Sequence, residues 1–266
     1  MIPALKNSVI VAAHPDDEIL WMSSILTQVE EIIVCFSEFP PIPVLGEGRK
    51  RVFSQYPLRN LTSLDIRESG SYDLADWQSP QINSFGLELK GDSTVISQYR
   101  KNFQCLCDLL RPRLEGVEAV FTHNPWGEYG HEDHVQVHRA VRFLQEEMGF
   151  EIWFSNYFGE RSLPLLKESL GTISGEIITY STNKDLASEI MELYVKNRCW
   201  TWPQAYQWPD TESFFRANAG REDGPEAGRQ DLALPMSLIA VELGPLSGVG
   251  RKSRFSERIK RMFRIE

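Results

Sequence analysis

The chain has 266 residues, a length that one large α/β domain or two small domains can fill. Hydrophobic residues make up 42% of it and charged residues 24%, values typical of a globular protein, which exclude wholesale disorder. The formal net charge of −9 argues against general nucleic-acid binding, because such a surface needs an excess of Lys and Arg.

The cysteines and the apolar segments indicate the cellular compartment. The four cysteines form no C-x-x-C pair and no disulfide framework, which is typical of buried, reduced thiols in an intracellular protein. No apolar run approaches the roughly 18 residues that a membrane span needs, and no signal peptide precedes the first apolar run. We therefore predict a cytoplasmic protein without a transmembrane segment.

Predicted strands and helices alternate through at least the first 155 residues. Short apolar runs predict strands, and apolar residues at helical spacing predict helices. The predicted strands are residues 8–13, 31–36, 61–66, 117–122, 151–154, 176–180 and 238–243, and the predicted helices are residues 16–28, 49–56, 95–110, 133–148 and 184–196. A Pro/Gly-rich loop is expected at residues 37–48. The alternation predicts an α/β fold, a three-layer, Rossmann-like, doubly wound and mostly parallel sheet with helices on both faces.

The first predicted strand runs directly into a polar cluster that begins with His14 and ends with Glu18. Pro15 suits the first turn of a helix, and the three carboxylates suit the positive end of the helix dipole. His14 and Asp17 can offer one nitrogen and one oxygen ligand to a metal such as Zn²⁺, which leaves Asp16 free as a base. The alternative is a solvated helix cap without a metal.

A second polar cluster also follows a predicted strand and enters a predicted helix. All five histidines of the chain lie in the two clusters, and four of them lie between His123 and His138. Open α/β sheets usually bind their ligands beyond the carboxyl ends of the strands, so we expect the two clusters to face one another. His14, Asp17 and one further histidine would then leave a coordination position open to water, which is typical of catalytic zinc.

The two clusters also carry a family resemblance. The run Ala13–Glu18, with Tyr129–His134 about 110 residues later, closely resembles the LmbE / PIG-L family of zinc-dependent deacetylases that act on N-acetylated sugars. The first motif is complete, whereas the second has Glu132 where the family usually has proline. The resemblance is good over roughly residues 8–36 and 117–155 and looser between them.

The resemblance implies a role for each motif residue. His14, Asp17 and His134 would bind Zn²⁺, and Asp16 would be the general base. His131 and Tyr129 would assist at the oxyanion.

The chemistry of these residue types agrees with the implied roles. Zn²⁺ lowers the pKa of bound water to about 7, and Asp16 can take the proton of that water and return it to the leaving amine. A protonated His131 facing the oxyanion is typically worth about 2.7–4 kcal/mol of barrier, and we expect Asp133 to keep that imidazole charged. Fe²⁺ or another divalent ion would suit the same ligands.

Other ligand sets stay open at this point. His131 and His134 are three residues apart, and His134 and His138 four apart, so either pair can converge on one ion. We favour His134 alone because it occupies the motif position. We expect His138 to be a core or supporting residue and His123 to line the pocket or form hydrogen bonds.

Five residues are candidates for substrate binding. Arg49 and Arg51 begin a predicted helix where the family places a substrate-binding arginine, and Arg49 is preferred because it lies nearest the loop. Glu68 lies where relatives commonly carry an aspartate that holds sugar hydroxyls. Trp202 could stack on a pyranose, and Arg216 could bind a hydroxyl or a phosphate. The alternatives are a solvated helix face for the arginines and an aromatic cap over the core for the tryptophan.

We predict one deacetylase domain over residues 1–250, followed by a tail at residues 251–266. The tail holds seven basic and two acidic residues, and its apolar residues fall on one helical face, which predicts a basic amphipathic helix. Such a helix could make peripheral contact with anionic lipid or a partner, or pack on its own acidic domain. Residues 217–231 are expected to form a lid or a connection.

The sequence therefore predicts a hydrolase acting on linear amide bonds, which removes the acetyl group from an N-acetylated sugar or glycoconjugate of the GlcNAc type. One alternative is a metal-dependent amidohydrolase acting on a non-sugar amide. Another is a non-catalytic carbohydrate-binding relative, which the intact Asp16 disfavours.

Overall fold

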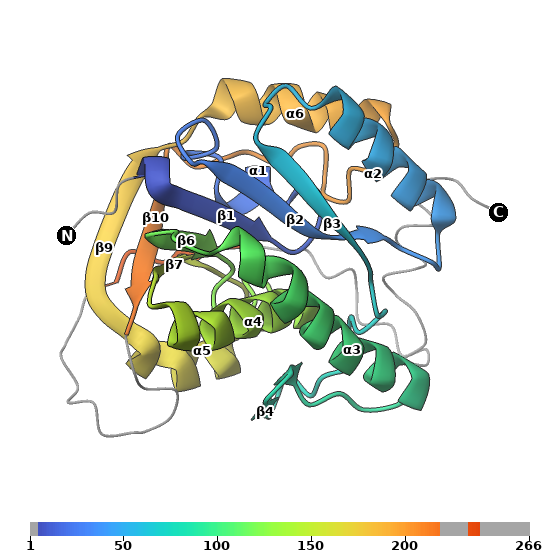
Figure 1. The fold of residues 1–266 in the computed structure, drawn as a ribbon, viewed down its shortest axis with the longest axis vertical. Helices are drawn as coiled ribbons and strands as arrows, with labels where there is room; N and C mark the ends of the chain where they lie inside the picture. The colour runs from blue at the N-terminus through green and yellow to red at the C-terminus, as the bar shows by residue number, and fades with distance from the viewer. Residues whose placement is uncertain (1–4, 219–233, 240–266) are drawn as a thin grey trace.

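A seven-stranded sheet forms the middle layer of the computed structural model, which describes residues 5–218 and 234–239. The strand order is β3-β2-β1-β6-β7-β10-β9 (Figure 1). These strands are β1 (Ser8–Ala12), β2 (Glu31–Glu38), β3 (Leu61–Arg67), β6 (Ala119–Thr122), β7 (Glu151–Ser155), β9 (Ile173–Ser181) and β10 (Thr211–Ala217). Two short pairs join β4 (Ile82–Asn83) to β5 (Gly86–Leu87) and β8 (Tyr157–Phe158) to β11 (Ser237–Leu238).

Helices cover both faces of the sheet, as Figure 1 shows. They are α1 (Asp17–Trp21), α2 (Pro43–Gln55), α3 (Ser93–Leu110), α4 (Glu132–Met148), α5 (Leu163–Ser169) and α6 (Lys184–Lys196), with 3₁₀ turns at Leu5–Asn7, Arg111–Arg113 and Leu170–Thr172. Helices α1, α2 and α6 enclose one hydrophobic core against the sheet, and α3, α4 and α5 enclose the other. The predicted three-layer, mostly parallel α/β fold is confirmed.

Strand β1 lies in the middle of the sheet and pairs in parallel with both β2 and β6. Its side chains alternate between the two cores: Val9 and Val11 pack on the α3 side, and Ile10 and Ala12 pack on the α1 side. The chain adds β2 and β3 on one side of β1 and later adds β6 on the other side. The strand order therefore reverses between β1 and β6, which is where open α/β sheets bind ligands.

Helix α1 is much shorter than the helix predicted over residues 16–28, because α1 ends at Trp21. Beyond this point Ser23 Oγ and the backbone N–H of Ser24 both donate to the buried carboxylate of Glu212, each at 2.7 Å. The Ser24 N–H is therefore used by a distant strand instead of by a helical carbonyl. The prediction was wrong because a partner 188 residues away decides the conformation.

Three other element boundaries differ from the prediction. No strand was predicted at β10, yet β10 inserts antiparallel between β7 and β9. Of the strand predicted at residues 238–243, the described residues include β11, which ends at Leu238, and residues from 240 onward lie outside the described part of the chain. Helix α2 begins at Pro43, inside the predicted loop at 37–48, because proline is well suited to the first turn of a helix.

Two predicted segments cannot be compared with the structure. The tail at 251–266 and nearly all of the expected lid at 217–231 lie outside the described residues, so the division into a domain and a tail stays a prediction. Within residues 5–218 and 234–239, no helix has both the length and the apolar character that crossing a membrane requires.

The left-handed backbone conformation of the residue that ends α4 can be tested by substitution. Gly149 ends this helix with φ of 81°, and none of the described residues has an atom within 4 Å of the place that a Cβ would take, so only the backbone conformation resists a side chain. We expect Gly149→Ala to lower the free energy of unfolding by about 1–2 kcal/mol, and Gly149→Asn to lower it less, because asparagine tolerates the left-handed region. Urea unfolding measures both, and equal stability of the two variants would contradict the assignment.

Candidate active site

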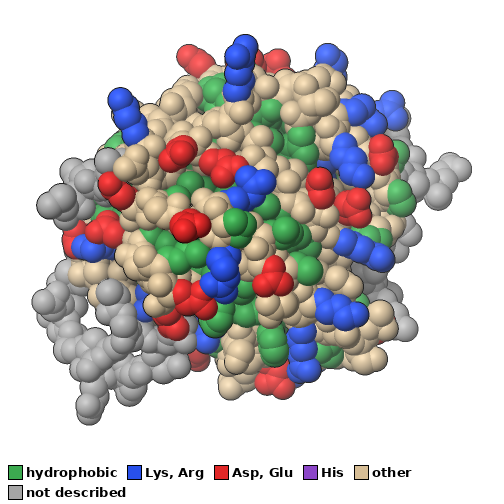
Figure 2. Space-filling view, in the orientation of Figure 1, with side chains coloured by type: hydrophobic (Ala, Val, Ile, Leu, Met, Phe, Trp, Pro, Cys, Tyr) green, Lys and Arg blue, Asp and Glu red, His purple; other side chains and the backbone are tan. Residues whose placement is uncertain are grey.

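The two polar clusters meet beyond the carboxyl ends of β1 and β6, as predicted. Asp17 Oδ2 lies 3.2 Å from His14 Nδ1 and 3.3 Å from His134 Nε2, although Asp17 and His134 are far apart in the sequence. All three side chains are almost completely buried. Figure 2 shows Lys, Arg, Asp and Glu interspersed over one face of the molecule with no histidine visible there, in agreement with the burial of all five histidines.

His134 has the geometry of a metal ligand. Its Nδ1 contacts Glu128 Oε2 at 2.7 Å, whereas its buried Nε2 has no hydrogen-bond partner among the described residues. Buried polar atoms without a partner are rare, and an imidazole nitrogen in this state is suited to bind an ion. The donor set of two histidines and one aspartate suits Zn²⁺ or a similar divalent metal.

Two histidines that could have been ligands are used elsewhere. His123 Nε2 lies 3.5 Å from Asp17 Oδ2, but it accepts the backbone N–H of Ala13 at 2.8 Å. His138 Nδ1 instead contacts the carbonyl oxygen of His123 at 2.7 Å, and its ring packs against Phe154. His123 thus joins the ends of β1 and β6, and His138 supports it.

His131 lies in the cluster, but its supporting contact is not the predicted one. Its ring stacks on His134 with centroids 4.7 Å apart, and its Nδ1 accepts the backbone N–H of Asp133 at 3.1 Å. An accepting Nδ1 carries no proton, and burial together with nearby His14 lowers the pKa of His131 well below its usual value. The expectation that Asp133 keeps His131 charged is therefore wrong. The Asp133 carboxylate instead accepts the Ser71 hydroxyl and lies 3.3 Å from His14 Nε2.

Asp16 is held in an unusual conformation beside the cluster. Its φ of 95° lies in the left-handed region, which costs about 1–2 kcal/mol for a non-glycine residue. Glu18 Oε2 accepts the Asp16 N–H at 2.9 Å, and Thr201 donates to Asp16 Oδ2 from its hydroxyl at 2.6 Å and its backbone N–H at 3.3 Å. Tyr56 and Tyr194 in turn donate to Glu18.

Sequence reasoning missed Thr201. It lies in an aromatic-rich stretch, where the tryptophans drew attention to stacking, and a single threonine carries no pattern of its own. Only its position 185 residues from Asp16, and 2.6 Å away in space, marks it as part of the site.

The charges of the site favour a bound cation. Burial disfavours the charged imidazole of His14, but the neighbouring carboxylates, Glu68 foremost, outweigh burial and raise its pKa to about 10. Burial likewise disfavours charge on His134, but Asp17 outweighs it and raises that pKa to about 9. Burial and the charge of Asp17 raise the pKa of Asp16 well above its ordinary value. Buried carboxylates are costly without positive charge, and a divalent ion can supply it.

The structure distinguishes the two candidate arginines. Arg49 is buried and its Nη1 contacts Glu68 Oε1 at 2.5 Å, while its Nε has no hydrogen-bond partner among the described residues. Arg51 is exposed and donates to Asn197. An oxygen of Glu68 lies within 4.8 Å of a ring nitrogen of His14, so the Arg49–Glu68 pair lies beside the candidate metal ligands, whereas Arg51 contacts Asn197.

Aromatic rings border the same cluster. Trp202 is half-buried and packs at 5.2 Å from both Tyr129 and Trp21, measured between ring centroids. The ring of Tyr129 lies 5.5 Å from that of His134. Trp202 and Tyr129 are therefore brought to the site from distant parts of the chain.

Arg216 is not brought to the site. It forms ion pairs with Glu151 and Glu176, on the two strands that flank β10. Glu151 is the first residue of β7, and the site follows the carboxyl ends of the parallel strands. Arg216 therefore lies at the end of the sheet opposite the site, where the parallel strands begin.

Glu132, which stands where the family usually has proline, supports a neighbouring segment. Its Oε1 accepts Trp77 Nε1 at 2.9 Å, Arg161 Nη2 at 3.0 Å and the backbone N–H of Ala75 at 3.1 Å. The Arg161 guanidinium lies over the rings of Tyr72 and Trp77 at 4.8 and 5.0 Å. The carboxylate thus ties the 72–77 segment to the start of α4.

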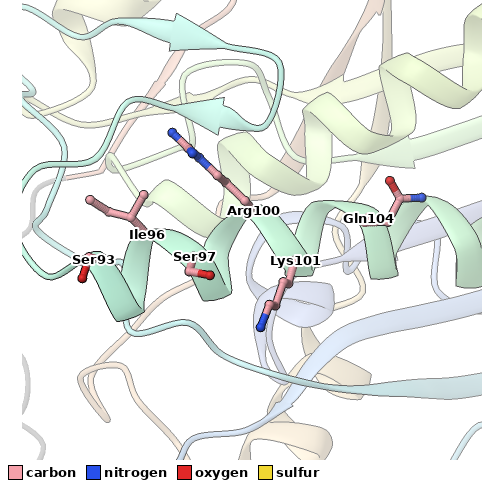
Figure 3. Close-up of a pocket in the computed structure, with 6 residues that line it drawn as sticks. All are labelled: Ser93, Ile96, Ser97, Arg100, Lys101 and Gln104. Atoms are coloured by element: carbon pink, nitrogen blue, oxygen red, sulfur yellow. The ribbon is translucent and has the colours of Figure 1, made fainter.

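A separate hollow lies along helix α3, away from this cluster. Figure 3 shows its lining, and the side chains all come from that one helix. They are Ser93, Ile96, Ser97, Arg100, Lys101 and Gln104. This set contains no carboxylate, histidine or cysteine, so it offers no chemistry comparable to that of the buried cluster.

Comparisons with known proteins agree with the motifs. The family model described as PIG-L, GlcNAc-PI de-N-acetylase, matches residues 9–144, just over half of the chain. The zinc-inhibited form of teicoplanin deacetylase Orf2 is 12% identical, with a TM-score of 0.51, and the match covers 81% of this chain and 99% of that one. A40926 pseudoaglycone deacetylase Dbv21 is 14% identical, with a TM-score of 0.46 and coverage of 80% and 98%. The first of these likenesses shows a shared fold. No curated protein sequence matches.

Replacing Glu132 by the usual proline tests its supporting contacts. Glu132 is the first residue of α4, where proline is tolerated, and His131 before it has the extended φ and ψ that proline favours. We expect Glu132→Pro to keep the helix but lower the free energy of unfolding by about 1–3 kcal/mol, because buried donors lose their acceptor. Hydrogen exchange at the Ala75 amide should also speed up.

Glu132→Gln is the matched control, since its amide oxygen can still accept from Trp77 and Ala75. Exchange at Ala75 that is equally slow in the proline variant would refute the role of this carboxylate.

Proposed function

Because this chain belongs to the PIG-L family, whose model is described as GlcNAc-PI de-N-acetylase, we propose that it is a metal-dependent N-deacetylase that acts on an N-acetylated sugar or glycoconjugate. The proposal is carried by one observation. The carboxylate of Asp17 lies between His14 and His134, within 3.3 Å of a nitrogen of each, and Asp16, whose carboxylate is held by Thr201, is its neighbour in the chain.

His14, Asp17 and His134 are the residues proposed to hold the metal, with Zn²⁺ as the expected ion and Fe²⁺ as an alternative. The Nε2 of His134, which forms no hydrogen bond with the described residues and faces Asp17 Oδ2 at 3.3 Å, and the excess of buried carboxylates support this fit. A bound zinc ion would supply a Lewis acid and a water whose pKa is lowered to about 7.

Asp16 is proposed as the general base. Thr201 engages only Oδ2, and burial and the charge of Asp17 raise the pKa of this carboxyl, so it binds a proton more readily than an ordinary aspartate, as a general base must. Asp16 would take a proton from the attacking water and deliver it to the amine that leaves. The strained backbone at Asp16 is consistent with a residue held for function.

His131 is proposed to stabilise the oxyanion from its Nε2–H, since its Nδ1 accepts a backbone N–H and carries no proton. One such donor is typically worth about 2.7–4 kcal/mol of barrier. Tyr129, whose ring lies 5.8 Å from that of His131, is proposed to assist.

The sugar is proposed to bind beside the Arg49–Glu68 pair and the ring of Trp202. A guanidinium and a carboxylate can bind hydroxyl groups, and an indole face can stack on the apolar side of a pyranose. The unpartnered Nε of Arg49 supports a polar ligand at this position.

Metal content tests the proposed ligands. We expect purified wild-type protein to bind one Zn²⁺ per chain, and His14→Ala and His134→Ala each to lose it, because two remaining ligands hold the ion poorly. His138→Gln should keep its zinc, since His138 contacts only a carbonyl oxygen near the cluster. Elemental analysis after dialysis measures this, and full zinc content in the His134 variant would overturn the ligand set.

Acetate release tests the reaction. We expect the wild type to release acetate from N-acetylglucosamine conjugates, and Asp16→Asn to lower turnover by about 10²–10⁴-fold with zinc still bound. A substrate panel that also holds acetylated amines without a sugar decides between the alternatives. Release only from those amines would indicate a general amidohydrolase, and sugar binding without any release would indicate a carbohydrate-binding protein.

A further inference from the structure

We propose that Glu128 orients His134 for metal binding and so acts as a positioning residue of the site. The inference rests on the proposed metal-dependent function, and its geometry is independent of the substrate. Glu128 has no exposed surface, and it lies in the loop between β6 and α4. The sequence motifs did not single it out.

The carboxylate of Glu128 accepts four contacts. Its Oε2 lies 2.7 Å from His134 Nδ1 and 3.0 Å from His123 Nδ1. Its Oε1 accepts the backbone N–H of Asn124 at 3.0 Å and the Ser155 hydroxyl at 2.6 Å. One buried carboxylate therefore links the end of β6, the end of β7 and the first turn of α4.

These contacts determine the tautomers of two histidines. An ionised carboxylate only accepts hydrogen bonds, so each histidine must place a proton on the Nδ1 that faces Glu128. In a neutral ring, the form that binds a metal ion, Nε2 is then an acceptor. His123 uses its Nε2 to accept the Ala13 N–H at 2.8 Å, whereas His134 Nε2 stays free and points toward Asp17, 3.3 Å from its Oδ2.

Glu128 thereby separates the roles of the two rings. His123 becomes a structural link to β1, and His134 presents its lone pair at the position shared with His14 and Asp17. A carboxylate on the far nitrogen of a metal-binding histidine holds the ring in place and makes it a stronger ligand. The stacking of the two rings, 3.9 Å apart, keeps them side by side above one carboxylate oxygen.

The backbone at this position supports a functional reason for the side chain. Glu128 has φ of 52°, in the left-handed region that favours glycine, and it follows Gly127 with φ of 70°. The conformation is held by the carbonyl of Glu128, which accepts Gly159 N–H at 3.0 Å and the Ser162 hydroxyl at 2.5 Å. Glycine would suit this backbone better, so the chain keeps a less favourable residue whose carboxylate makes all four contacts.

Glu128→Gln tests the proposal, because it preserves size and removes an acceptor that both imidazoles share. We expect its Zn²⁺ affinity, measured by competition with a chelator, to fall about 10–100-fold. The rise in melting temperature on adding Zn²⁺ should shrink in parallel. A merely structural role would lower the melting temperature of the metal-free protein and leave the zinc affinity unchanged.

Glu212→Gln is the matched control. Glu212 is also a fully buried carboxylate that accepts two hydrogen bonds, but its donors are Ser23 and Ser24 and it contacts no histidine. We expect this variant to bind Zn²⁺ as the wild type does. If Glu128→Gln does not fold, Glu128→Asp is used in the same measurement. The shorter side chain keeps the carboxylate charge but moves it away from the imidazoles of His123 and His134.

The outcomes separate this inference from the proposed function. Wild-type affinity in the folded Glu128 variant, equal losses in the Glu128 and Glu212 variants, or a wild type that binds no Zn²⁺ would each overturn the role of Glu128. A wild type that binds zinc tightly but releases no acetate would refute the deacetylase function. A selective loss of zinc affinity in the Glu128 variant would still support the positioning role.

Discussion

The parallel pairing of β1 with β6 is the constraint on which the site depends. In this register Val11 lies opposite Thr122, so both strands end at the same level and release their polar residues at the same point. Just beyond the last strand pair, the Ala13 N–H donates a hydrogen bond to His123 Nε2, which joins the two strand ends. A shift of one residue in this register would turn every side chain of β1 to the other face, and His14 would no longer meet His134.

Because the two clusters meet beyond these strand ends, the site contains many buried carboxylates. Burial of carboxylates is tolerated only where hydrogen bonds or positive charge compensate for lost hydration. Each acid of the two clusters therefore has a different contact. Asp17 faces the histidines, and Glu18 accepts the backbone N–H of Asp16. Glu128 contacts His134 Nδ1, and Asp133 contacts His14 Nε2, in each case the ring nitrogen that does not face Asp17. Most of the polar residues around the candidate metal position orient the few side chains that would bind the metal or react, which is usual in a preorganised site.

The antiparallel strand β10 and the short helix α1 belong to the same arrangement. Glu212, on β10, accepts hydrogen bonds from Ser23 and Ser24, which follow Trp21, so the helix ends after five residues. Trp208, which lies just before β10, donates from its Nε1 to the carbonyl of Ile19 at 2.5 Å and so ties α1 to the same segment. An insertion into the sheet far along the sequence thus determines where the helix that begins at Asp17 ends.

The sequence by itself determined the layered α/β fold and the meeting of the two polar clusters, because both follow from local patterns and from the rule for strand ends. The preference for His134 over the other histidines came from the family motif. The tertiary structure alone decided the rest. Packing between distant segments sets the contact of Thr201 with Asp16, the burial of Arg49 beside Glu68 and the pairing of Asp133 with His14. Such contacts depend on side-chain directions and on the acceptors that remain unused after the backbone has folded, and no local pattern of residues encodes them.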